Sequence, residues 1–136
     1  MKRILTAIAA LALASSSAFA GSSAGHGQGG PLGPYDTMIA QANASGELFR
    51  ITGVCQSACT MFLSINNVCV ERSAVLKFHS GKPGVPVRVT QRMEATYNGA
   101  LRSYVEEHHF MDTPDFHSIP GSVMISQFGY KECPRK

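Results

Sequence analysis

GVCQSACTMFLS, residues 53–64, is the stretch that decides the fold. Its first four residues, Gly53 to Gln56, predict a tight turn. Ser57 follows and opens a predicted helix over residues 58–65, because serine is a favoured residue at helix starts. That helix is apolar on nearly every side, which predicts that it lies buried in the core.

The segments around this stretch alternate between helix and strand patterns. Residues 34–45 predict a helix that stops before a glycine, and residues 48–52 predict a strand. Further short strands are predicted over residues 68–70 and 75–78, followed by a loop over 82–86. The longest predicted helix, capped by a threonine, covers residues 90–108, and a last one covers 122–128. No linker or repeat divides these elements, so we expect a single α/β domain over residues 29–136, with a short sheet and packed helices.

The first twenty residues have the three parts of a secretory signal peptide. Lys2 and Arg3 precede an apolar run over residues 4–13, and small residues at Ala18 and Ala20 predict cleavage after Ala20. The apolar run is shorter than the roughly 20 residues that a membrane-spanning helix needs. We therefore expect a periplasmic or secreted protein without a membrane partner after cleavage. A Gly- and Ser-rich segment, residues 21–28, predicts a flexible leader ahead of the domain.

The charge balance argues against a nucleic-acid partner. The 12 basic residues fall to 10 once Lys2 and Arg3 leave with the signal, against 9 acidic residues, which gives a formal charge of +1. No basic stripe remains for a phosphate backbone, and the surface of the processed chain is expected to be nearly neutral.

Four cysteines lie beyond the signal peptide: Cys55, Cys59, Cys69 and Cys133. An even number in an oxidising compartment predicts two disulfides, and four cysteines allow three pairings. In one of them Cys59–Cys69 closes a short local loop and Cys55–Cys133 ties the tail to the centre of the domain. The alternative is a zinc site in which His79 joins the cysteines, but the spacing lacks a close Cys-x-x-Cys pair. We expect no metal and no cofactor.

Three features suggest a hydrolytic centre: Gly29-Gly30, then Ser57 at a helix start, then His79 at a strand end. A serine hydroxyl becomes a nucleophile when a base takes its proton, and histidine is the usual base. The backbone N–H groups at a helix start can stabilise an oxyanion, and a Gly-Gly turn lets a second N–H group approach. Each feature alone has a plainer explanation, such as a helix cap for Ser57.

Residues 53–64, followed by Cys69-Val70 and by AVLKFH at residues 74–79, resemble exported bacterial proteins of the Clp-protease-like (crotonase-type) superfamily. That family is similar to the proteolytic subunit of the Clp protease. Its pattern is a Gly-Gly turn, a helix, a strand, a Gly-x-x-x-Ser-Ala turn, a helix, a strand pair and a histidine. The family has strands before its Gly-Gly turn, whereas the sheet here is expected to be cut short.

The resemblance implies a role for each matching residue. Ser57 is the expected nucleophile, His79 the general base, and the N–H groups of Gly30 and Ala58 the oxyanion hole. Asp115 is the candidate for the carboxylate that orients His79, with a Ser-His dyad as the alternative. The resemblance also implies structural disulfides and a peptide, protein or other acyl substrate.

Two other functions compete with hydrolysis. One is a catalytically inactive module that binds a peptide or partner protein through an exposed sheet edge. The other is a domain that completes itself as a homo-oligomer.

Overall fold

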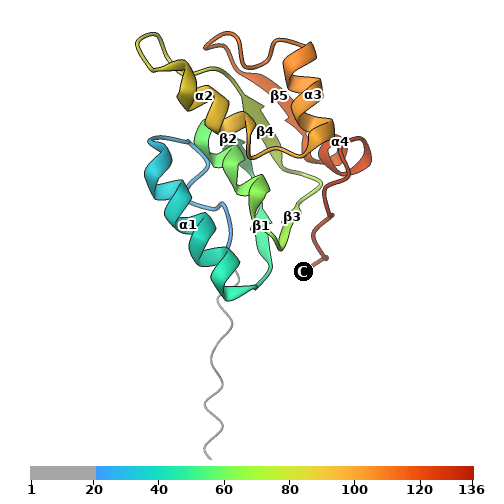
Figure 1. Cartoon of the computed structure of the whole chain (residues 1–136). Helices are drawn as coiled ribbons and strands as arrows, with labels where there is room; N and C mark the ends of the chain where they lie inside the picture. Colours follow the sequence, from blue (N-terminus) through green and yellow to red (C-terminus); the bar gives the residue numbers. More distant parts are fainter. Residues whose placement is uncertain (1–20) are drawn as a thin grey trace, which may run out of the picture.

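The centre of the molecule is η1, a 3-10 helix over Ser57–Ser64 that packs against two helices and three strands (Figure 1). The computed structural model describes residues 21–136, so the predicted signal peptide lies outside the described residues. In chain order, the elements around η1 are α1 (Leu32–Ser45), β1 (Phe49–Ile51), β2 (Val54–Gln56), β3 (Val68–Val70), β4 (Val75–Phe78), α2 (Val87–Glu94), α3 (Gly99–Glu107), β5 (His117–Pro120) and α4 (Gly121–Ser126). This arrangement confirms an α/β chain with small sheets.

The helix predicted after Ser57 is confirmed as a buried element, although it is a 3-10 helix. All six residues from Ala58 to Leu63 are buried. Phe62 lies at the centre of an aromatic group, with ring centroids 5.1 Å from Tyr35 and 4.7 Å from Phe49. Because every side of η1 contacts other parts of the chain, its apolar residues all contribute to the core.

Two consecutive strands, β1 and β2, pair in parallel with two later consecutive strands, β3 and β4. β1 pairs with β3 in the register Phe49↔Val68, and β2 pairs with β4 in the register Val54↔Val75. The connection between β3 and β4 is two residues longer than the connection between β1 and β2, and it forms a turn at residues 71–74. β5, which has no counterpart among the predicted strands, adds to β4 in antiparallel orientation. The turn predicted over residues 53–56 is also wrong beyond Gly53, since Val54–Gln56 form β2.

Residues 21–28 are not the flexible leader that their composition predicts. Ser22 forms a parallel bridge with Arg50, and the Gln56 N–H group donates to the carbonyl of Gly27 at 2.9 Å. These bonds supply partners for an edge that β1 and β2 otherwise leave open, and such edges favour pairing with any extended segment. The edge that the sequence leaves bare is therefore covered along β1 and β2 by the chain itself.

The long helix predicted over residues 90–108 is wrong, because the chain breaks it into α2 and α3. The Asn98 side chain accepts a hydrogen bond from the N–H group of Leu101 at 2.9 Å and starts a new helix. A side chain that satisfies the backbone in this way competes with helix continuation. Thr90 does not cap a helix but lies inside α2, where its hydroxyl accepts a hydrogen bond from Gly81 N–H.

The other two predicted helices are present with small shifts at their ends. α1 begins two residues earlier than predicted and ends as predicted, with Gly46 in the left-handed conformation at φ 69°. α4 covers Gly121–Ser126 rather than residues 122–128.

Two disulfides join the four cysteines, but not in the pairing considered above. Cys55 bonds to Cys59, and Cys69 bonds to Cys133. The second bond ties the C-terminal segment to β3, where the Cys133 N–H group donates to the carbonyl of Val70. Disulfides are typical of oxidising compartments. Within residues 21–136, no helix has the length and apolar character needed to cross a membrane.

Candidate functional site

A cavity of about 590 Å³ brings together three of the predicted site residues: Ser57, His79 and Gly30. It lies between the turn before α1, the start of η1, the end of β4, and α2 with the loop before it. Gly29, the other residue of the predicted Gly-Gly turn, also lines it. Ala58 and Asp115 do not line it.

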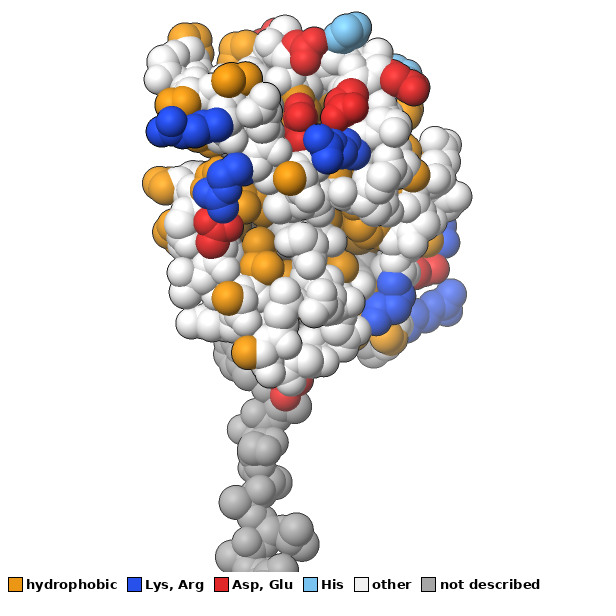
Figure 2. Space-filling model, in the orientation of Figure 1, with side chains coloured by type: hydrophobic (Ala, Val, Ile, Leu, Met, Phe, Trp, Pro, Cys, Tyr) orange, Lys and Arg blue, Asp and Glu red, His pale blue; other side chains and the backbone are white. Residues whose placement is uncertain are grey.

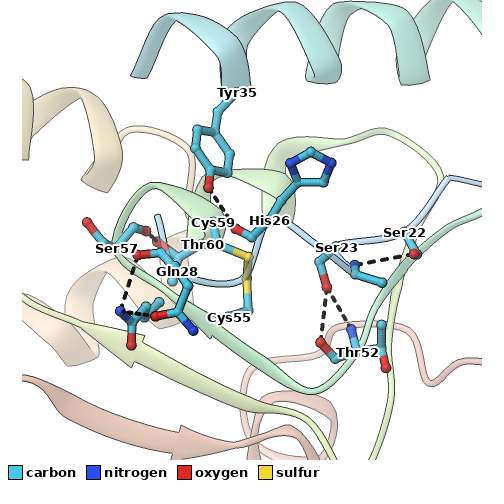
Figure 3. Close-up of a disulfide and its surroundings, with 12 residues drawn as sticks. Ser22, Ser23, His26, Gln28, Tyr35, Thr52, Cys55, Ser57, Cys59 and Thr60 are labelled. Atoms are coloured by element: carbon cyan, nitrogen blue, oxygen red, sulfur yellow. Dashed lines mark hydrogen bonds between the residues drawn. A yellow bond between two sulfur atoms is a disulfide. The ribbon is translucent and has the colours of Figure 1, made fainter. Parts of the chain in front are cut away.

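Ser57 has an unusual backbone conformation, with φ at 55° in the left-handed region. Outside glycine this conformation is uncommon, and where it occurs the surrounding structure must hold it. Two features do so here. The Cys55–Cys59 disulfide closes a small ring around Ser57 (Figure 3), and the Thr60 hydroxyl donates to the Ser57 carbonyl at 2.7 Å.

A second layer of contacts supports the Ser57 turn from the core. The Thr60 hydroxyl lies 2.7 Å from the phenol oxygen of Tyr97. Since the single Thr60 proton goes to the Ser57 carbonyl, Tyr97 donates to Thr60. Burial raises the pKa of the Tyr97 phenol well above its usual value, so this donor keeps its proton.

Gly29, in the turn before α1, packs closely against Ser57. A Cβ atom at position 29 would lie 2.7 Å from the Ser57 Cβ, and the φ of 78° also favours glycine. Gln56 holds the same turn, because its side-chain amide donates to the carbonyl of Gln28 at 3.2 Å. Glycine at position 29 is therefore a requirement of close approach, which local sequence alone does not reveal.

His79 follows β4 directly and is 8% exposed. Its Nδ1 atom lies 3.2 Å from the carbonyl oxygen of Pro114, and its ring lies 4.3 Å, centroid to centroid, from that of Phe116. A carbonyl can only accept, so Nδ1 carries the proton in this bond. This tautomer leaves Nε2 as the acceptor, which is the form that a general base requires.

Ser57 and His79 are not hydrogen-bonded to each other within residues 21–136. Ser57 is the first residue of η1 rather than its cap, since Gln56 occupies the cap position. In sites without substrate, catalytic hydrogen bonds are often long and tighten only when substrate binds. Ser57 and His79 therefore line one cavity without a hydrogen bond between them in the described residues.

The two remaining predicted site residues lie outside the cavity. Asp115 is exposed, and the contact to His79 Nδ1 comes from the neighbouring carbonyl of Pro114. An orienting role for Asp115 stays a prediction. Ala58 is fully buried in the first turn of η1, where backbone N–H groups have no partner inside the helix.

The cavity carries positive charge and apolar surface. Lys82 and Arg92 line it, and none of the lining residues is acidic. Arg92 forms an ion pair of 2.7 Å with Asp36 of α1. Figure 2 shows Lys and Arg side chains beside hydrophobic atoms at the upper left, over α2 and the loop before it. Phe116, 46% exposed, adds an apolar wall beside His79.

A zinc site from the cysteines and His79 is not formed, since all four sulfur atoms are in disulfides. Residues 21–136 contain no group of three or more His, Cys, Asp or Glu side chains arranged to hold a metal ion.

No family model matches this chain, and no curated protein matches it. Function is therefore inferred from the residues of the cavity.

Proposed function

We propose that the protein is a periplasmic or secreted serine hydrolase, a Clp-like peptidase, that acts through Ser57 and His79. One observation carries the proposal: a single cavity is lined by a serine with a left-handed backbone, by a buried histidine with Nε2 free to accept, and by a Gly-Gly turn. Strained backbone of this kind clusters at functional sites. The signal-peptide pattern and the two disulfides support the compartment.

The proposed reaction uses each of these groups in turn. His79 Nε2 takes the proton of the Ser57 hydroxyl as its oxygen bonds to the acyl carbon. The N–H groups of Gly30 and Ala58 are proposed to stabilise the oxyanion of the tetrahedral intermediate. The intermediate collapses as the protonated imidazole passes its proton to the leaving amine. Water then releases the acyl group from Ser57 by the same steps in reverse.

The orienting contact for His79 is proposed to be the Pro114 carbonyl, so that the centre works as a Ser-His dyad. Asp115→Asn separates this proposal from a triad. In a dyad, Asp115→Asn leaves the reaction of Ser57 with an acylating probe within about twofold of the wild type. A triad carboxylate typically contributes orders of magnitude, so a loss of that size assigns the role to Asp115.

The cavity lining favours an extended peptide or other acyl compound with an apolar group and a negative charge. Lys82 makes no ion pair within residues 21–136, so its ammonium group is free to meet a substrate carboxylate. Lys82→Glu is expected to lower kcat/KM more for an acidic substrate than for a neutral one of the same length. Equal loss for both would contradict the charge argument.

A fluorophosphonate probe on the oxidised, processed protein tests the hydrolase proposal. We expect covalent labelling that disappears in Ser57→Ala and drops sharply in His79→Ala. Ser64→Ala is the matched control, because Ser64 lies at the other end of η1 and is also partly buried. Folded protein that does not label, or labelling that survives Ser57→Ala, would refute the proposal.

The second candidate is an inactive module that binds a peptide or partner protein at the same cavity. Its exposed apolar rim favours this function, since Val85 and Phe116 are 43% and 46% exposed. Such a module does not label with the probe, yet its affinity for extended peptides falls in Phe116→Ser. A homo-oligomer is a separate proposal, tested by the mass of the processed protein in solution.

A further inference from the structure

A second cavity, of about 310 Å³, lies on the other side of α1 from the Gly-Gly turn, between α1, β1 and the first described residues. It shares no lining residue with the Ser57 cavity. Glu47 lines it, and the Glu47 Oε2 atom is buried without a hydrogen-bond partner within residues 21–136. Burying a carboxylate oxygen without a hydrogen-bond partner costs free energy, so we expect a donor group to bind this atom.

The sheet register brings the start of the described chain to the same place. The Arg50 N–H group donates to the carbonyl of Gly21, and Ser22 bridges Arg50 in parallel orientation. Gly21 is therefore level with Phe49, and its backbone nitrogen lies on the Glu47-Leu48 side of that residue. Gly21 also lines the cavity itself. Figure 1 shows this start of the described chain (blue) beside β1, near the loop that follows α1.

Close packing keeps Gly21 in this position. A Cβ atom there would lie 2.7 Å from the ring of Phe49, so only glycine lies flat against that ring. The same ring packs against Phe62 of η1, with centroids 4.7 Å apart. The backbone of Gly21 is thus packed against the Phe49 side chain.

We propose that cleavage after Ala20 creates an α-ammonium group on Gly21 that binds Glu47 in this cavity. While Gly21 is joined to Ala20, its nitrogen is an uncharged amide. Cleavage by water converts it to an amine, which takes a proton at neutral pH and supplies a positive charge with three donors. Removal of the signal peptide would then complete a buried ion pair that locks the first strand-like segment to β1. This inference rests on the predicted cleavage site and is independent of the hydrolase proposal.

The other charged groups near the cavity do not fill this role. His26 also lines it, but its side chain belongs to an exposed residue, and it makes no ion pair with Glu47 within residues 21–136. Arg50, on the neighbouring strand, is already paired with Glu71 and donates to the carbonyl of Pro134. The new α-ammonium group is therefore the cation left to meet Glu47.

The test is a titration of the α-amine in the exported, oxidised protein. Mass spectrometry first identifies the N-terminal residue. Reductive ¹³C-methylation then marks the α-amine, which keeps its charge, and NMR follows its signal with pH. A nearby carboxylate raises the pKa of an amine. We expect this pKa to lie about one unit or more above that of the same group in urea-unfolded protein, and the shift to vanish in Glu47→Gln.

Two comparisons keep the test decisive even if Glu47→Gln does not fold. A chain that carries one extra alanine before Gly21 moves the charge by about 3.3 Å along the strand direction and should lose the raised pKa. His26→Asn should keep it. An N-terminus other than Gly21, an unshifted pKa in the wild type, a shift that survives Glu47→Gln or the added alanine, or one that vanishes in His26→Asn would each overturn the proposal.

Discussion

Removal of the disulfides one at a time should cost very different amounts of stability. Cys69 and Cys133 are separated by 64 positions, whereas Cys55 and Cys59 are separated by 4. A disulfide restricts the unfolded chain in proportion to the logarithm of the loop that it closes. That relation gives about 4 kcal/mol for the long loop and about 2 kcal/mol for the short one.

The assay is urea unfolding of two double variants under oxidising conditions. Cys69→Ala/Cys133→Ala should lower the free energy of unfolding by about 2 kcal/mol more than Cys55→Ala/Cys59→Ala. Both pairs are buried, so the small voids left by alanine are similar in kind. A thiol titration in denaturant accompanies each measurement and should find no free thiol in either variant.

A third variant, Cys59→Ala/Cys69→Ala, tests the pairing itself. With Cys55–Cys59 and Cys69–Cys133 bonded, this variant breaks both disulfides and leaves two free thiols. In the pairing that joins Cys59 to Cys69, it would leave none. Absence of free thiols in this variant would refute the pairing. Equal losses of stability in the first two variants would refute the reasoning from loop length.

The remaining predictions concern the support of the Ser57 turn. Gly29→Ala should lower fluorophosphonate labelling of Ser57, and should lower the free energy of unfolding by about 1–3 kcal/mol more than Gly25→Ala does. Both glycines have φ near 80°, but only a Cβ atom at position 29 would meet Ser57. Equal losses of stability in urea unfolding would refute the clash. Tyr97→Phe should cost about 1 kcal/mol through the lost bond to Thr60, as measured at neutral pH. Burial raises the pKa of Tyr97 in the folded state, so the unfolded state releases this proton first and stability falls as pH rises above 10. Tyr97→Phe should make that fall shallower by up to about 1.4 kcal/mol per pH unit, and an unchanged slope would contradict the assignment.

Much of the local structure could be predicted from the sequence. The strands over residues 68–70 and 75–78 are present at the predicted positions, and a buried helix does begin at Ser57. The end of α1 before Gly46 was also predictable. Short apolar strands and helix ends at glycine depend on residues that are neighbours in the sequence, so the sequence pattern predicts them.

The misses share a different origin. Residues 21–28 look like a flexible leader, and nothing within the segment shows that β1 and β2 offer an edge to pair with. The helical spacing of residues 90–108 is real, but Asn98 caps a second helix because the chain must turn there to pack. β5 becomes a strand only because β4 lies beside it.

For the candidate site, the sequence by itself determined which residue types are present: a serine at a helix start, a histidine after a strand, and a Gly-Gly pair. Only the tertiary structure decided that they share one cavity, that the Cys55–Cys59 disulfide surrounds Ser57, and that the partner of His79 is the Pro114 carbonyl. The physical reason is range. Turns, caps and periodicity act over a few residues, whereas cavity walls and disulfide partners depend on which distant segments pack together.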